Sequence, residues 1–233
     1  MRTLRQLLLG STLLAALFAS ATAGAASSAE TWLNHYYQNP NPDGLKSAVF
    51  QLSRDGFLDD DANVPLTIGF LSSVFAQNPA RVDEWLAFGR DLPAAHQRIV
   101  IAAAWASGNP SGVAEFRRIA ARSAADRDNL NALLAATPDL ATAPVLSPSS
   151  LNAKWGSFLA TGDRAPVQAI LAALGNDDRS QFGQDVRWSL ARNAAAHDRV
   201  LAICKDELVR QPNELRESLK AVIHQVENRT PSS

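Results

Sequence analysis

Apolar positions recur along this chain with helical spacing in almost every segment after the first 26 positions. One segment shows the i, i+3, i+4, i+7 pattern that places apolar side chains on one face of an α-helix: Val167, Ile170, Leu171 and Leu174. Alternation of apolar and polar residues, which is typical of half-buried strands, is absent from the sequence. The pattern therefore predicts an all-α protein.

Polar turns divide this pattern into about twelve helices. Asn78-Pro79 and Asn109-Pro110 each place a capping residue before a proline, which needs no amide partner in a first helical turn. We expect Asp163 to cap another helix, and Asn63 to cap the helix that Pro65 opens. The predicted helices span 28–38, 43–55, 64–77, 79–89, 93–107, 110–122, 124–136, 149–161, 164–174, 177–195, 198–210 and 212–228.

The longest irregular stretch, 137–148, is rich in proline, alanine and threonine. We interpret it as a hinge within one helical-repeat domain that spans 27–228. Residues 229–233 are expected to form a disordered tail, because a short polar terminus buries too little apolar surface to order itself.

Three of the predicted helix–turn–helix joints share a pattern. In each, a bulky apolar residue lies four positions before the capping residue, and a valine lies four positions after it; the capping residues are Asn78, Asn109 and Asp163. The first two joints are 31 residues apart, and a weaker joint near Asp198 lies 35 residues after the third. Such spacings are typical of paired-helix repeats, which bury their apolar faces only by stacking on neighbours.

These joints resemble those of degenerate tetratricopeptide-like repeats. The segment 155–163 is similar to the first helix of such repeats, and the chain resembles uncharacterised exported bacterial helical proteins. The family's full set of fixed glycine, tyrosine, alanine and proline positions is not present. The resemblance implies antiparallel helix pairs stacked as a short α-solenoid.

The first 26 residues follow the three-part pattern of a cleavable secretory signal peptide. Arg2 and Arg5 precede an apolar run at 7–18 and small residues at 19–26, which include the cleavage motif Ala21-Thr22-Ala23. An apolar run of about 12 residues is shorter than the roughly 20 needed to span a bilayer. We therefore expect cleavage near 23–26, a periplasmic or secreted bacterial protein, and no stable membrane insertion after cleavage.

The charge and the cysteine content exclude one class of partner and one kind of fold stabilisation. The net charge is −1, and it becomes −3 when Arg2 and Arg5 are removed with the leader. Nucleic-acid binding would need a clustered excess of basic residues, so no nucleic-acid partner is expected. The single cysteine, Cys204, excludes an internal disulfide and lies on a helical segment, where we expect a buried and inert thiol.

Metal-binding patterns are weak. Residues 59–63 begin like a calcium loop, but Val64 and Phe70 stand where such a loop needs glycine and a closing glutamate. No two of the four histidines have metal-ligand spacing, and we expect His96 and His197 to be surface or capping residues. The sequence therefore predicts no metal site and no cofactor.

Candidate chemistry for catalysis is equally sparse. No nucleophile-elbow motif occurs, and the glutamates, Glu115 and Glu207 among them, are expected on helix surfaces or in first turns. A pair of carboxylates brought together from distant segments stays open as an alternative, because glycosidase pairs are assembled in this way. We assign no catalytic residues.

Aromatic residues are the best candidates for binding a partner. Trp32, Tyr36 and Tyr37 cluster on the first predicted helix after the leader, and tryptophan and tyrosine are enriched in binding surfaces. The competing interpretation is an N-terminal capping helix that packs these rings on the repeats. The remaining tryptophans occupy apolar positions and are expected in the core: Trp85, Trp105, Trp155 and Trp188.

Together these features predict a non-catalytic module that binds another envelope protein or peptide. The alternative is an envelope enzyme that acts on cell-wall or polysaccharide substrates through distant carboxylates. The two differ in whether a cleft brings two carboxylates face to face.

Overall fold

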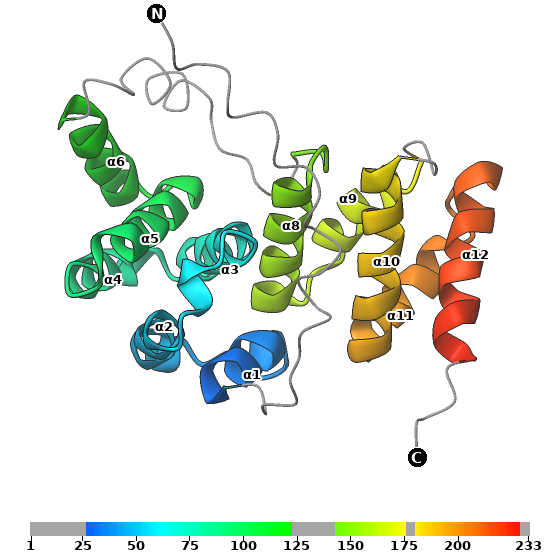
Figure 1. The fold of residues 1–233 in the computed structure, drawn as a ribbon, viewed down its shortest axis with the longest axis horizontal. Coiled ribbons are helices and arrows are strands. Elements are labelled where there is room, and N and C mark those ends of the chain that lie inside the picture. The colour runs from blue at the N-terminus through cyan, green and yellow to red at the C-terminus, as the bar shows by residue number, and fades with distance from the viewer. Residues whose placement is uncertain (1–26, 123–142, 176–179, 229–233) are drawn as a thin grey trace, which may run out of the picture.

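The computed structural model describes residues 27–122, 143–175 and 180–228, and every regular element in these ranges is helical. Figure 1 shows the helices arranged around a central pair, α3 and α8. The prediction of an all-α protein is confirmed. The signal peptide, the helix predicted at 124–136, the first part of the proposed hinge and the tail at 229–233 lie outside the described residues.

Eleven α-helices lie in the described ranges, and their bounds follow the predicted ones closely. They are α1 (Ser28–His35), α2 (Leu45–Arg54), α3 (Asn63–Gln77), α4 (Val82–Gly89), α5 (Ala94–Ala106), α6 (Pro110–Arg122), α8 (Pro148–Thr161), α9 (Arg164–Ala173), α10 (Gln181–Ala196), α11 (Asp198–Glu207) and α12 (Asn213–Glu227). Single turns of 3-10 helix precede or follow several of them: η1 (Tyr36–Gln38), η2 (Pro42–Gly44), η3 (Phe57–Asp59) and η4 (Pro79–Arg81).

The predicted helix caps are only partly correct. Asn109 caps α6, because its Oδ1 accepts a hydrogen bond from the backbone N–H of Ser111 at 2.9 Å. Asn78 instead donates its side-chain amide to the carbonyl oxygen of Val74 at 2.8 Å, so it satisfies the end of α3 rather than the start of the next helix. Asp163 makes no side-chain capping bond at α9.

Two further starts differ from the sequence-based expectation. Asn63 lies inside the first turn of α3, where its side-chain amide donates to the carbonyl oxygen of Phe57 at 3.2 Å. Ser147 and Ser150 form a capping box at the start of α8, with 3.2 Å between the Ser150 N–H and Ser147 Oγ. The end of the proposed hinge is therefore an ordered helix start.

The largest helix–helix interface joins α3 to α8, and two glycines make it close. A Cβ built on Gly69 would lie 2.0 Å from the Ala153 carbonyl oxygen, and one on Gly156 would lie 1.9 Å from the Leu66 carbonyl oxygen. Both distances are far below van der Waals contact, so only glycine fits at these positions. The Ser157 hydroxyl donates to the Gly69 carbonyl across the same interface at 3.3 Å.

Helices pack outward from this central pair on both sides. On one side α5 contacts α3, and α4, α5 and α6 contact one another. On the other side α8, α10 and α12 lie in one row, with α9 and α11 behind them (Figure 1). The buried apolar residues form one continuous core, whose largest fully buried side chains include Trp85, Phe70, Phe75 and Phe158.

Several residues are more exposed or more buried than the sequence predicted. Trp188 is 48% exposed, with the Arg192 guanidinium 5.4 Å from its ring centroid, so the expectation that it is a core residue is wrong. His96 and His197 are buried, not surface residues, and Glu207 is buried at a helix–helix contact. Each of the three is held by polar partners from distant segments, which sequence spacing does not reveal. Among the described helices, none combines the length and apolarity that crossing a membrane requires.

Candidate functional site

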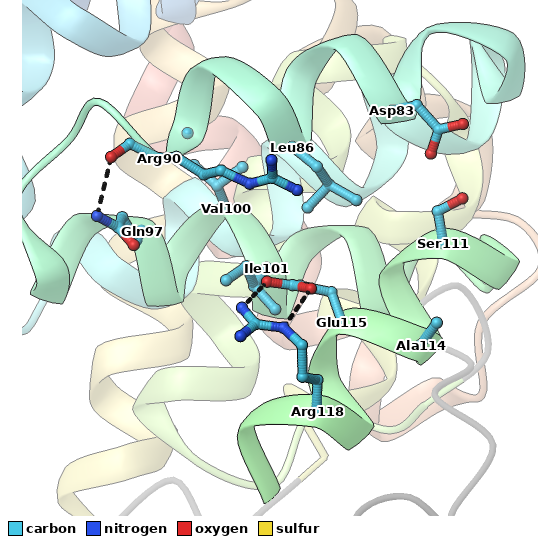
Figure 2. A pocket seen from close by; sticks show the side chains of 11 residues that line it. Asp83, Leu86, Arg90, Gln97, Val100, Ile101, Ser111, Ala114, Glu115 and Arg118 are labelled. Atoms are coloured by element: carbon cyan, nitrogen blue, oxygen red, sulfur yellow. Dashed lines mark hydrogen bonds and ion pairs between the residues drawn. The ribbon is translucent and has the colours of Figure 1, made fainter. Parts of the chain in front are cut away.

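A groove of about 510 Å³ lies between α4, α5 and α6. Figure 2 shows side chains from all three helices that line it. This volume falls in the range of small-ligand and peptide sites, roughly 300–1,000 Å³. A smaller hollow of about 330 Å³ lies on another face of α4, lined in part by Phe88 and Asp91.

Apolar side chains form the middle of the groove. Leu86 comes from α4, and Val100 and Ile101 come from α5. Val100 belongs to the α5 stripe that packs inward, whereas Ile101 is only partly buried and presents apolar surface to the groove. An apolar floor of this kind contributes binding energy through burial, at about 25 cal/mol per Å².

Charged side chains form the rim of the groove. Glu115 and Arg118 of α6 make a bidentate ion pair, with 2.8 Å between Arg118 Nε and Glu115 Oε2 and a second contact between Nη2 and Oε1. The Glu115 carboxylate raises the pKa of the Arg118 guanidinium. Asp83 of α4 and Arg90, which directly follows α4, also line the groove, and neither has an ion-pair partner among the described residues.

The aromatic residues predicted to bind a partner lie elsewhere. Tyr36 is buried, and its ring centroid lies 4.9 Å from that of Trp32 and 5.2 Å from that of Phe70. Tyr37 packs on Phe158, with 5.0 Å between centroids. These contacts fit the interpretation of α1 as a capping helix; a role for the three residues in partner binding stays a prediction.

A serine–histidine–aspartate chain joins α2, η3 and α5. Ser53 Oγ lies 2.8 Å from His96 Nδ1, and His96 Nε2 lies 2.9 Å from Asp59 Oδ1. A carboxylate can only accept hydrogen bonds, so His96 donates one to Asp59 through Nε2–H. Nδ1 of the neutral ring then accepts a hydrogen bond from the Ser53 hydroxyl. The burial is the reverse of a catalytic triad, which has a buried carboxylate and an accessible histidine: the Asp59 side chain is 68% exposed and that of His96 is 4% exposed.

We interpret this chain as a structural link between three segments. His96 is 37 residues from Asp59 and 43 from Ser53 in sequence, so no local sequence motif predicts this contact. Hydrogen bonds within the protein also explain two of the acidic side chains of the calcium-like turn at 59–63. Asp59 contacts His96, and Asp60 Oδ1 accepts the backbone N–H of Ala62 at 2.9 Å. Within the ranges that the structure describes, no three histidine, cysteine or acidic residues are grouped as metal ligands.

Glu207 is the centre of a second polar cluster, between α9 and the end of α11. Its Oε1 accepts from Arg164 Nη1 at 3.2 Å, from Gln168 Nε2 at 3.0 Å and from Arg210 Nη1 at 2.9 Å. The Glu207 side chain is only 4% exposed, so its charge needs these partners. Sequence reasoning missed the cluster because Arg164 and Glu207 are 43 residues apart.

Burial shifts the pKa values of Cys204 and His197, which lie outside the groove. Burial raises the pKa of Cys204 to about 12, which keeps the thiol protonated and unreactive at neutral pH. This confirms the prediction of a buried cysteine. Burial, with a smaller contribution from His35, lowers the pKa of His197, whose Nδ1 lies 3.4 Å from the Tyr37 hydroxyl.

Comparison with known proteins finds no matching family model, no similar curated protein and no similar solved structure. The resemblance to tetratricopeptide-like repeats therefore stays a prediction.

Proposed function

We propose that this chain is an exported, non-catalytic helical-repeat module that binds another envelope protein or peptide in the groove between α4, α5 and α6. The observation that carries the proposal is the groove itself, with an apolar floor at Leu86 and Ile101 and charged side chains at its rim. Apolar surroundings with a few convergent polar groups are typical of binding sites. The signal-peptide pattern at 1–26 supports a periplasmic or secreted location.

The arrangement of helices supports the repeat interpretation. Consecutive helices α8 and α9 contact each other, as do α10 and α11, and α10 also contacts α12. Helix pairs that stack on neighbouring pairs would produce this set of contacts. Such arrays bind partners on the extended surface that their stacked helices form, and the groove is lined by three consecutive helices.

Site-specific photo-crosslinking in the periplasm tests this proposal. Ala114 is exposed and lines the groove, so a photoreactive amino acid there should form an adduct with the bound partner. The same group at Ala165, which is exposed on α9, is the matched control. We expect an adduct from position 114 that disappears when Ile101→Glu places a charge on the apolar floor.

An adduct that forms equally at both positions, or that persists in the Ile101→Glu protein, would contradict binding in the groove. Loss of the adduct has meaning only if the variant is folded. Its far-UV circular dichroism spectrum should therefore match that of the unaltered protein.

The enzymatic alternative rests on one observation, that Asp83 and Glu115 line the same groove from different helices. The ion pair with Arg118 counts against it, because both carboxylate oxygens of Glu115 already accept hydrogen bonds from the guanidinium. Assays of the mature protein on peptidoglycan and on polysaccharides, with Asp83→Asn as comparison, test this reaction class. Turnover that is abolished by this substitution would favour the enzyme over the binding module.

A further inference from the structure

The four charges on the groove rim divide into one neutralised pair and two separate groups. Glu115 and Arg118 on α6 compensate each other. Asp83 on α4 and Arg90 at its C-terminal end have no ion-pair partner within the described part of the chain, and both residues are exposed. The groove therefore presents one anion and one cation to a ligand. A polyanion or a polycation would meet a like charge at one of them, which costs binding energy.

The separation of Asp83 and Arg90 along the helix sets the length of a ligand that can reach both residues. Asp83 is the second residue of α4, and Arg90 directly follows its last residue in a helical backbone conformation. Seven residues separate them, which places their Cα atoms about two turns, or roughly 10.5 Å, apart along the helix axis. An extended peptide advances about 3.3–3.6 Å per residue. The axial separation of the two residues therefore matches about three residues of extended chain.

The apolar floor lies between the charges. In Figure 2, Arg90 and Asp83 lie toward opposite ends of the groove, with Leu86 between them and Ile101 beneath. A ligand that extends from one charge to the other would pass over these two side chains. Its middle portion would therefore be apolar, and its ends would carry opposite charges.

We infer that the groove takes a short peptide of about three residues with both termini free. The ligand's carboxylate would bind Arg90, its ammonium group would bind Asp83, and an apolar central side chain would contact Leu86 and Ile101. This inference rests on the proposed function, because it names the class of peptide that the same groove binds. Both peptide termini are charged at pH 7, since their ordinary pKa values are about 3.3–3.7 and 7.7–8.0.

Isothermal titration calorimetry with four forms of Ala-Leu-Ala tests the inference: the free peptide, the N-acetylated peptide, the C-amidated peptide and the doubly blocked peptide. Each block removes one charge–charge hydrogen-bonded contact, so each should weaken binding by about tenfold. Replacing the central leucine by serine should also weaken binding, because the apolar floor loses its partner.

Substitutions in the protein assign each terminus to its residue. In Arg90→Gln the free acid and the C-amide should bind equally well, while the preference for a free amine remains. In Asp83→Asn the free amine and the N-acetyl peptide should bind equally well, while the preference for a free acid remains. Arg98→Gln and Asp91→Asn are the matched controls, since both residues are exposed and neither lines the groove. Both control proteins should keep both preferences.

The pH dependence gives a readout that a merely structural role of Asp83 would not produce. Affinity for the free peptide should fall as the pH rises through about 8, where the terminal amine loses its proton. Affinity for the N-acetyl peptide should not change in this range. Asp83→Asn should remove the difference between the two pH profiles.

Three negative outcomes bear on this inference and on the proposed function. If the doubly blocked peptide binds as tightly as the free one and Ile101→Glu removes binding, the groove binds peptides but does not select their termini, and the inference is overturned. If no form of the peptide binds and the crosslink from position 114 is also absent, the proposed function fails with it. If Asp83→Asn and Arg90→Gln each abolish binding of all four forms alike, the assignment of termini to residues is wrong.

Discussion

At the scale of single residues, the structure depends on a few positions where only glycine fits. Gly156 is the clearest of them, because a Cβ there would lie 1.9 Å from the backbone oxygen of Leu66 and 2.7 Å from the backbone N of Phe70. Backbone atoms cannot move aside as the end of a flexible side chain can. The packing of α3 on α8 therefore tolerates no side chain at this position.

Gly156→Ala should lower the free energy of unfolding by about 3 kcal/mol or more, because the two helices must separate to accommodate the methyl group. For a chain of this size the melting temperature should fall by about 6–12 °C, as measured by circular dichroism. Gly175→Ala is the control, since its Cβ would lie 3.2 Å from the movable Leu215 Cδ2 and 3.7 Å from the nearest backbone atom, the Ala172 oxygen. Equal losses in the two variants would show that close helix approach is not the cause.

His197 should make stability depend on pH. Its pKa is lowered in the folded protein, so the folded state binds a proton less readily than the unfolded state, where the pKa is about 6.5. The stabilisation is present above pH 6.5 and is lost as the pH falls from there toward the folded-state pKa. Urea unfolding between pH 7.5 and 5 should therefore show falling stability, and His197→Asn should flatten this slope.

His224→Asn provides the comparison for this measurement. His224 is exposed on α12, so its replacement should leave the slope unchanged. A slope in His197→Asn that equals that of the unaltered protein would show that other groups carry the pH dependence.

At the scale of elements, polar clusters fix how helices meet, while apolar faces supply the attraction between them. The Ser53–His96–Asp59 chain ties α5 to α2 and η3. Glu207 ties α11 to α9 through Arg164 and Gln168. Such groups specify geometry because each has only a few positions in which its hydrogen bonds are made.

Glu207→Gln should destabilise the contact between α9 and α11 by about 1–3 kcal/mol, because the charge that holds two arginines and Gln168 is lost. Both arginines keep access to water, which limits the loss. Glu217→Gln removes an exposed carboxylate paired with Lys220 and should change stability by less than about 1 kcal/mol. Chemical denaturation of both variants gives the comparison, and equal effects would contradict a special role for the buried cluster.

At the scale of the whole molecule, the α3–α8 interface connects the helices around the groove to those of the C-terminal side. Cys204 lies in α11, and Gly69 lies in α3. The two are linked through α8 and α9, since each of these helices contacts the next along this route. One continuous core of this kind is expected to unfold as a single cooperative unit.

Exposure of Cys204 should therefore report on the whole fold. The native thiol, with a pKa of about 12, should not react with a chromogenic disulfide reagent at pH 8, and its reactivity should rise with urea along the same curve as the loss of helix. Gly69→Ala, although it lies in α3, should shift both curves to lower urea concentration by the same amount. If the substitution lowers helix content but leaves Cys204 protected, the two sides unfold independently.

How far the sequence predicted the site can be judged from particular residues. The helix that carries Asp83 and ends just before Arg90, and the helix that carries Glu115 and Arg118, were both predicted, because their apolar stripes and the Asn-Pro turns are local signals. That α4, α5 and α6 enclose a groove was not predictable, because it depends on the angles at which the three helices pack. The polar clusters at His96 and Glu207 were missed for the same reason.

By itself, the sequence determined the helical class of the described residues, the approximate ends of most helices and the burial of Cys204. These follow from the spacing of apolar residues and from turn-forming residues, which act over a few positions. The tertiary structure alone decided which helices meet at Gly69 and Gly156, which charges are paired and which face a groove. Those features join residues that are distant in sequence, and only packing brings such residues together.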